Sequence, residues 1–387
     1  MFRQNKVEFT GNEVSHNLRK EFNSLAKQAH WAESVQDETE EFLRTSKHLI
    51  EKINDTIIDS NEIEMGRLYD INHLYPNCGL IQNIAFHPSG DFLFLTYGRF
   101  MKLFEVDGKE NALLQTVLFP KDVSTQFAKF DHEGNQIISC SKKKTLFIYD
   151  IPSGEARTAT TLLEAKNLKD SEFKTVGGLC VAPSGQYVAV LAKPNRVLIL
   201  SLKNMQYLFE FAHNGPISTL DFSPDSQFLY CAGKKGDVYV WDMKQQACIR
   251  RYQHYGALST EVIRNCPKGL YQALGADNGV VTMYKLDKDF LNAGRNPKPW
   301  KEIFNLTTTV SDIAFNHDSQ LVSIISKEKE DALRLVHLPT GTVYSNWPKA
   351  ASLSYACAAF SPDSTRFCIG TVSGRILLWK IPHYIPK

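Results

Sequence analysis

Lysine and arginine side chains gather at points where the chain is expected to turn between strands. The densest groups are Lys142-Lys143-Lys144 and Lys234-Lys235, and the second lies between two glycines. Cations grouped in this way can bind phosphate or carboxylate groups. The phrase Gly233 to Gly236 is too short for a phosphate-binding loop, which needs a longer glycine-rich turn before a helix. We interpret it as a turn between two strands.

Other chemistry-bearing residues show no catalytic or metal-binding spacing. The sequence has no GxSxG, HExxH, GxGxxG or Walker A phrase, and its eight cysteines never form CxxC. His87, His132 and His317 recur at the same point of a repeated phrase, which favours a structural role in a turn over metal ligation. We therefore expect no enzyme activity, no cofactor, no metal and no small-molecule substrate.

Composition restricts the class of protein further. The net charge is +2, so any contact with nucleic acid must come from a local patch. No apolar run approaches the length of a membrane span, and the first residues lack the apolar core of a signal peptide. The cysteines are expected to be buried free thiols, which indicates the cytosol or the nucleus.

The elements that must position these residues are visible as a repeat. Residues 217–242 contain a strand ending at Phe222, a Ser-Pro-Asp-Ser turn, a second strand, a Lys-Lys-Gly turn and a third strand ending at Trp241-Asp242. Pro, Asp, Ser and Gly favour such turns. The same turn phrase recurs near residues 88, 132, 183, 224, 267, 317 and 362.

Strand-ending phrases such as Phe147-Ile148-Tyr149-Asp150 and Leu378-Trp379 keep the same period of roughly 40–50 residues. An all-β chain with seven such units is typical of a seven-bladed WD40 β-propeller. A β-sandwich with irregular loops is the alternative, and two independent anchors with one period disfavour it. We place the propeller at 65–387 and expect 65–73 to close the ring as the outer strand of the last blade, beside 376–380.

Residues 1–64 lack the repeated turn phrase and are predicted to be a short helical N-terminal arm. Leu18, Phe22 and Leu25 recur at helical spacing, and Trp31 follows them. The apolar side of this arm has no visible partner within the arm. Docking on the propeller and docking on another subunit both stay open, with Leu18, Phe22, Leu25 and Trp31 as the docking residues.

The basic residues fall on one part of this framework. In such blades the turns between the second and third strands lie on a common face. The turns of the first four blades carry Arg99, Lys142, Lys143, Lys144, Lys193, Arg196, Lys234 and Lys235. Neighbouring blades would merge them into a basic crescent that contacts RNA phosphates or an acidic partner; a set of solvated lysines is the alternative.

One histidine is expected to lack its usual partner. His213 precedes the fourth repeat, where blades of this type often hold a structural histidine. The aspartate that usually pairs with it from the following turn is replaced by Lys234 or Lys235. The hydrogen-bond network around His213 is therefore predicted to be incomplete.

Several phrases also resemble a known family, the U3 small nucleolar RNA-associated protein eighteen family. They are Asn296-Pro297-Lys298-Pro299, Asn305 to Val310, Arg334 to Pro339, Thr342 to Pro348, Gly374 to Tyr384, Phe104 to Lys109 and, in the arm, Leu18 to Phe22 with Trp31-Ala32-Glu33. The resemblance covers the chain from about residue 15 to 384. Family members usually carry a long charged N-terminal tail, and few residues precede Leu18 here, so recruitment of the exosome's helicase through such a tail is not expected.

The resemblance implies a nucleolar scaffold subunit of the small-subunit processome. Such a subunit would work beside other WD-repeat subunits and with U3 RNA and pre-rRNA, touched directly or through the complex, in 18S rRNA maturation. A general WD40 adaptor, such as a ubiquitin-ligase substrate receptor or a chromatin reader, is the alternative. It would need a central pocket with an aromatic cage or an arginine ring, and the sequence shows no motif that predicts one.

Overall fold

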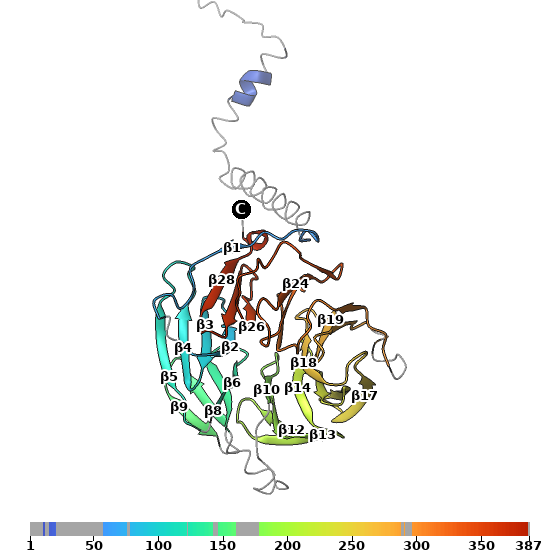
Figure 1. Cartoon of the computed structure of the whole chain (residues 1–387). Helices are drawn as coiled ribbons and strands as arrows, with labels where there is room; N and C mark the ends of the chain where they lie inside the picture. Colours follow the sequence, from blue (N-terminus) through green and yellow to red (C-terminus); the bar gives the residue numbers. More distant parts are fainter. Residues whose placement is uncertain are drawn as a thin grey trace, which may run out of the picture. The chain divides into compact units, whose positions relative to one another are not determined.

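The computed structural model of the chain describes residues 11, 15–20, 57–75, 78–121, 123–141, 146–159, 178–287, 290 and 296–385. Within these ranges the chain forms seven antiparallel sheets of four strands each, arranged as blades around a central axis (Figure 1). The predicted seven-bladed all-β propeller is confirmed.

Blades 1 to 4 follow one another along the chain, and each runs from the inner to the outer strand in sequence order. Their strands are β2 (Ile81–Phe86), β3 (Phe92–Tyr97), β4 (Phe100–Glu105) and β5 (Leu113–Leu118); β6 (Val123–Phe130), β7 (Gln136–Ser141), β8 (Leu146–Asp150) and β9 (Ala156–Ala159); β10 (Gly178–Val181), β11 (Tyr187–Lys193), β12 (Arg196–Ser201) and β13 (Tyr207–Ala212); β14 (Ile217–Phe222), β15 (Phe228–Gly233), β16 (Asp237–Asp242) and β17 (Ala247–Gln253).

Blades 5 to 7 complete the ring, and a short 3-10 helix, η3 (Pro382–Tyr384), follows the last strand. Their strands are β18 (Thr260–Asn265), β19 (Tyr271–Ala276), β20 (Val281–Lys285) and β21 (Lys301–Ile303); β22 (Asp312–Phe315), β23 (Leu321–Ile325), β24 (Leu333–His337) and β25 (Thr342–Val343); β26 (Tyr355–Phe360), β27 (Arg366–Thr371), β28 (Ile376–Lys380) and β1 (Gly66–Arg67).

The turn between the first and second strands has the same backbone conformation in every blade. Its fourth residue has a positive φ and donates its N–H to the carbonyl of the first residue, as in Ser226 (φ 57°), whose nitrogen lies 2.8 Å from the Ser223 oxygen. Glycine or a small polar residue tolerates this region best. The seven residues are Gly90, Gly134, Gly185, Ser226, Gly269, Ser319 and Ser364.

Blade 7 is closed by the segment that precedes blade 1. Strand β1 pairs antiparallel with β28, with Gly66 opposite Lys380 and Arg67 opposite Trp379. The strand is shorter than the predicted 65–73, but pairing continues beyond it, because Leu68 and Ile71 donate their N–H groups to carbonyls of β28 at 3.0 Å each. This closure covers a sheet edge that would otherwise be free to pair with another chain.

The chain divides into two compact units at Ile58 and Asp59, ahead of the start that we place at 65. Residues 59–63 belong with the propeller unit because they hydrogen-bond to the outer edge of blade 6. The Tyr344 hydroxyl donates to the Asp59 carbonyl at 2.7 Å, and Asn346 Nδ2 donates to the Ile63 carbonyl at 2.9 Å. In the N-terminal unit, residues 15–20 are helical.

The hydrophobic core lies between neighbouring blades rather than at the centre of the ring. Strands of blades 3 and 4 share one cluster that includes Ile199, Phe211 and Leu229, and Phe211 stacks on Trp241 with ring centroids 4.5 Å apart. Burying such side chains contributes about 1.5–3 kcal/mol each. Because each interface holds two blades together, the inner strands keep fixed positions around the axis.

Candidate functional site

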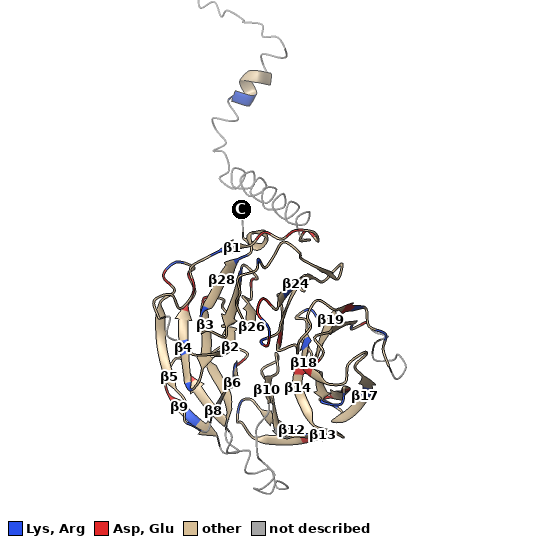
Figure 2. Ribbon diagram, viewed as in Figure 1, with Lys and Arg blue, Asp and Glu red and all other residues tan. Residues whose placement is uncertain are grey.

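The turns between the second and third strands of the blades lie on one face, which we call the basic-turn face. It carries Arg99 between β3 and β4, Arg196 at the start of β12, and Lys234 and Lys235 between β15 and β16. Figure 2 shows where cationic and anionic residues fall on the ribbon. The successive turns of blades 1, 3 and 4 thus place these four residues on the same side of the ring.

Two of these cations already bind groups of their own blades. Arg99 donates from Nε and Nη2 to the carbonyl of Phe119, at 3.2 and 2.9 Å, and Arg196 forms an ion pair with Glu210. Lys234 and Lys235 are exposed and make no ion pair with the described residues. Among the described members of the predicted crescent, they are the cations most available to an external anion.

Several predicted contact residues lie outside the described part of the chain. These are Lys142, Lys143 and Lys144, the side chain of Lys193, and the arm residues Phe22, Leu25 and Trp31. Leu18 lies in the short helix at 15–20 and is 60% exposed. The basic crescent and the docking role of the arm therefore stay predictions.

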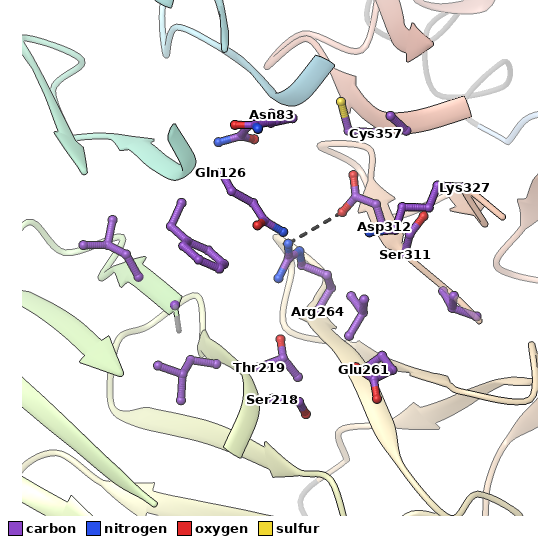
Figure 3. Close-up of a pocket in the computed structure, with 18 of the residues that line it drawn as sticks. Asn83, Gln126, Ser218, Thr219, Glu261, Arg264, Ser311, Asp312, Lys327 and Cys357 are labelled. Atoms are coloured by element: carbon purple, nitrogen blue, oxygen red, sulfur yellow. Dashed lines mark ion pairs between the residues drawn. The ribbon is translucent and has the colours of Figure 1, made fainter. Parts of the chain in front are cut away.

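Sequence reasoning missed a cavity of about 660 Å³ on the central axis. The first strands of all seven blades bound it, and Figure 3 shows polar side chains converging on it from several blades. Its lining also includes Lys327 and Glu328 from the turn between β23 and β24. The cavity therefore extends to the basic-turn face.

A ring of polar residues lines this cavity at one level of the inner strands. In blades 2 to 5 the residue before the last one of the first strand is Lys129, Cys180, Asp221 and Arg264, opposite Ile138, Ala189, Tyr230 and Ala273 of the second strand. In blades 1, 6 and 7 the same position is alanine. A sequence alignment of the seven repeats at the strand end would have revealed this concentration of charge.

The carboxylates of the cavity join neighbouring blades. Asp221 accepts hydrogen bonds from the N–H of Asn265 at 2.7 Å and from its side-chain amide at 3.0 Å, and the Cys180 thiol points at it with the sulfur 3.7 Å away. Asp312 accepts from the N–H of Ala358 at 3.2 Å. Its other oxygen lies 3.6 Å from Nη2 of Arg264 (Figure 3).

Burial shifts the pKa values of the groups around the cavity. Desolvation raises the pKa of Asp221, which the Arg264 guanidinium partly opposes, and it raises the pKa of Cys180 to about 12. Thiols with raised pKa values are poor nucleophiles because the thiolate is the reactive form. Cys180 is therefore not an activated thiol.

Lys129 differs from its neighbours because its ammonium makes no hydrogen bond or ion pair with the residues that the structure describes. Desolvation is the main cause that lowers its pKa, and repulsion from Arg264 adds to it. Asp312, Cys180 and Asp221 oppose this shift. Lys129 is thus a half-buried cation that lies inside the cavity without a direct counter-ion.

The described residues contain no cluster of His, Cys, Asp and Glu side chains suited to a metal ion. Two of the repeated histidines make contacts of turn residues: His87 Nδ1 lies 2.8 Å from the Ser89 hydroxyl in its own turn, and His317 Nδ1 lies 2.6 Å from the Ser364 hydroxyl in the corresponding turn of blade 7. Over the described ranges, the structure also has no helix long and apolar enough to span a membrane.

Fold and repeat together define the class: this is a WD40-repeat propeller, and residues 205–242 match the family model for the WD domain, G-beta repeat. Similar proteins extend across eukaryotes. The chain is 30% identical over 351 residues to the U3 small nucleolar RNA-associated protein 18 homolog of Arabidopsis thaliana, and the match covers 89% of the chain and 62% of that relative. It is 31% identical to the Mus musculus homolog, over 83% of the chain and 58% of the relative.

A third relative, the probable U3 small nucleolar RNA-associated protein 18 of Schizosaccharomyces pombe, is 28% identical over 97% of the chain and 74% of its own length. The expected resemblance is thereby confirmed, since the chain is similar over most of its length to proteins named U3 small nucleolar RNA-associated protein 18. The chain spans about three fifths of the length of the Arabidopsis and mouse relatives.

Proposed function

We propose that this protein is a non-catalytic scaffold subunit of the small-subunit processome, where it supports pre-rRNA processing and 18S rRNA maturation with U3 small nucleolar RNA. The observation that carries the proposal is the similarity, over 83–97% of the chain, to proteins named for their association with that RNA. The propeller and the segment before it both fall within the matched length of the Schizosaccharomyces relative.

The architecture suits a scaffold. A closed ring of blades presents separate surfaces, namely two faces and an outer rim, on a rigid frame. In this proposal other WD-repeat subunits of the processome bind these surfaces and the arm, and the protein makes and breaks no bond itself. The RNA is contacted directly or through those subunits, and Lys234 and Lys235 are exposed members of the predicted crescent that could make a direct contact.

The proposed place of work is the nucleolus. The buried free cysteines fit a reducing compartment such as the nucleus, since seven of the eight are buried or partly buried. The test is affinity purification of the full chain from cells, followed by mass spectrometry and by measurement of co-purifying U3 RNA, with fluorescence imaging of the same tagged chain.

We expect nucleolar signal, enrichment of U3 RNA over an unrelated small nuclear RNA, and other WD-repeat proteins among the partners. Depletion is expected to lower 18S rRNA relative to the large-subunit rRNA. A diffuse cytosolic signal without U3 RNA or pre-rRNA would refute the proposal and favour a general adaptor.

A further inference from the structure

The outer corner of blade 1 carries exposed aromatic rings. Tyr97 ends β3 and Phe100 begins β4, directly opposite it in the register. Their rings stack with centroids 5.4 Å apart and an angle of 25° between the planes. Phe100 is still 41% exposed, and Leu118, its partner on β5, is 57% exposed. The three side chains lie on one face of the sheet, because residues paired across neighbouring strands point to the same side.

A lysine extends this surface toward the segment that precedes blade 1. Lys102 lies two residues after Phe100 on β4, so it points to the same face of the sheet. Its ammonium lies 5.4 Å from the ring centroids of both Tyr97 and Tyr75, and 3.8 Å from Cys78 Sγ. No described carboxylate forms an ion pair with it. We call this surface the aromatic corner, which consists of Tyr75, Tyr97, Phe100, Lys102 and Leu118.

We propose that the aromatic corner binds single-stranded RNA, with a base stacked on Phe100 and a phosphate paired with Lys102. The inference deepens the proposed function and rests on it, because it assumes that the protein works beside RNA. Aromatic rings next to cations hold single strands without reading their sequence, since every base has a flat face. The Phe100 ring is already held by Tyr97 before a base arrives, which reduces the ordering that binding requires.

The charge around the aromatic corner matches an anion. The sequence has no aspartate or glutamate at 71–90 or at 92–104, which hold the loop before blade 1, strands β2 and β3 and most of β4. Arg99 lies in the turn between Tyr97 and Phe100, and its guanidinium donates to the carbonyl of Phe119. A bond to a neutral carbonyl leaves the positive charge of Arg99 uncompensated, so Arg99 still attracts phosphates.

The combination of flat rings and unpaired charge favours RNA over a protein partner. An apolar protein surface would take Lys102 out of water without a counter-ion, which costs free energy. A nucleotide supplies both a flat base for Phe100 and a phosphate for Lys102. Strands β3, β4 and β5 lie side by side in blade 1 (Figure 1), and the corner ends at the turn that carries Arg99. A strand of RNA bound there can therefore continue onto the basic-turn face.

The test measures the binding of fluorescein-labelled decauridylate to the purified full chain by fluorescence anisotropy at several salt concentrations. Phe100→Ala removes the stacking ring, Phe100→Trp keeps a flat ring, and Lys102→Met removes the cation. Phe304→Ala is the matched control, because Phe304 is 65% exposed and follows β21 of blade 5, outside the corner. Crosslinking of a 4-thiouridine oligonucleotide to the unmodified chain, mapped by mass spectrometry, locates the bases without any variant.

We expect Phe100→Ala to weaken the affinity about tenfold, and Phe100→Trp and Phe304→Ala to leave it within about twofold. Lys102→Met is expected to reduce the salt slope by about 0.7, the contribution of one phosphate of a single strand. Crosslinks are expected on the residues of the aromatic corner.

Equal affinity of Phe100→Ala and the unmodified chain, equally tight binding of duplex RNA, or crosslinks confined to other blades would each overturn the inference. Loss of partner proteins from affinity-purified Phe100→Ala, with its oligouridylate affinity unchanged, would make the corner a protein interface. Absence of decauridylate binding while U3 RNA still co-purifies with the full chain refutes only this inference. Decauridylate binding without U3 RNA in the purification refutes only the proposed function.

Discussion

His254 Nδ1 lies 2.8 Å from the hydroxyl oxygen of Thr260, and this contact fixes a buried imidazole just before blade 5. The other ring nitrogen, Nε2, lies 3.1 Å from the hydroxyl oxygen of Thr282. His213 occupies the equivalent point before blade 4, directly after an outer strand, but its Nε2 is buried without a hydrogen-bond partner in the described structure. The incomplete network predicted around His213 is thus confirmed, and the complete one belongs to the next blade.

The two histidines are therefore expected to respond differently to mutation. Thr282→Val leaves Nε2 of His254 unpaired in the core and should lower the free energy of unfolding by about 1–3 kcal/mol. His213→Phe removes the unpaired Nε2 and also the contact of Nδ1 with the half-buried Gly215 backbone, so it should cost less, about 1 kcal/mol. Urea unfolding followed by tryptophan fluorescence measures both, and a larger loss for His213→Phe than for Thr282→Val would contradict this explanation.

His254 also predicts how stability depends on pH. Burial lowers its pKa to about 4, whereas an unfolded histidine titrates near its ordinary value of about 6.5. Between these values the unfolded chain binds more protons, so this stabilisation is complete above about pH 6.5 and is lost as the pH falls toward 4. The difference in unfolding free energy between the unmodified chain and His254→Gln should shrink by on the order of 3 kcal/mol over that range. A difference that stays constant with pH would show that His254 does not titrate in this way.

The repeat could be predicted from the sequence because each blade marks itself with a turn of fixed conformation. Phrases such as Ser223-Pro224-Asp225-Ser226 are local, and glycine or serine at the fourth position meets the positive φ that the turn requires. The seven-bladed fold therefore followed from seven local signals.

The turn signals do not reveal the central cavity, although an alignment of the repeats shows charge at the ends of the first strands. Lys129, Asp221, Arg264 and Asp312 are up to 183 residues apart (312 − 129) and come together only because the inner strands share one axis. The sequence also could not predict that Arg99 and Arg196 are bound within their own blades. Their partners, Phe119 and Glu210, lie on or beside outer strands whose register depends on bulges. The sequence therefore predicted which turns carry charged residues, but not which of these residues pair with other groups of the protein.

One of the turn glycines is expected to be irreplaceable for two reasons. Gly134 has φ +83°, and a Cβ at that position would overlap the imidazole of His87 in the preceding blade. Gly134→Ala should lower the free energy of unfolding by about 2 kcal/mol or more. Gly98→Ala is the matched control, since Gly98 has φ +55° with no atom near the added methyl group, and it should cost only about 1 kcal/mol. Equal losses in urea titrations would mean that the His87 contact adds nothing.

The basic-turn face leads to a salt-dependence test. Reversing Lys234 and Lys235 to glutamate should weaken association with a pre-rRNA fragment or an acidic partner, and it should reduce the salt slope by about one for each phosphate that the protein no longer neutralises. Reversing Lys142, Lys143 and Lys144 tests the part of the predicted crescent outside the described residues. Arg196→Gln should have little effect on RNA association, because Glu210 already pairs with Arg196. Affinity and salt slope that stay unchanged in both lysine variants would mean that these residues are only solvated surface.

Lys129 is expected to reduce the stability of the free protein. Burial lowers its pKa, so the folded chain holds this proton less tightly than the unfolded chain does, and the charge is a net cost at neutral pH. Lys129→Met should therefore raise the free energy of unfolding, by about 1 kcal/mol or more. This gain should be complete below the lowered pKa and should shrink as the pH rises toward about 10.5, where the unfolded lysine also loses its proton.

Urea unfolding of Lys129→Met and of the control Lys234→Met, each at neutral and alkaline pH, measures this gain. The exposed Lys234 should give almost no change, because its charge is solvated in both states. A loss of stability in Lys129→Met would mean that the cavity carboxylates compensate the ammonium fully.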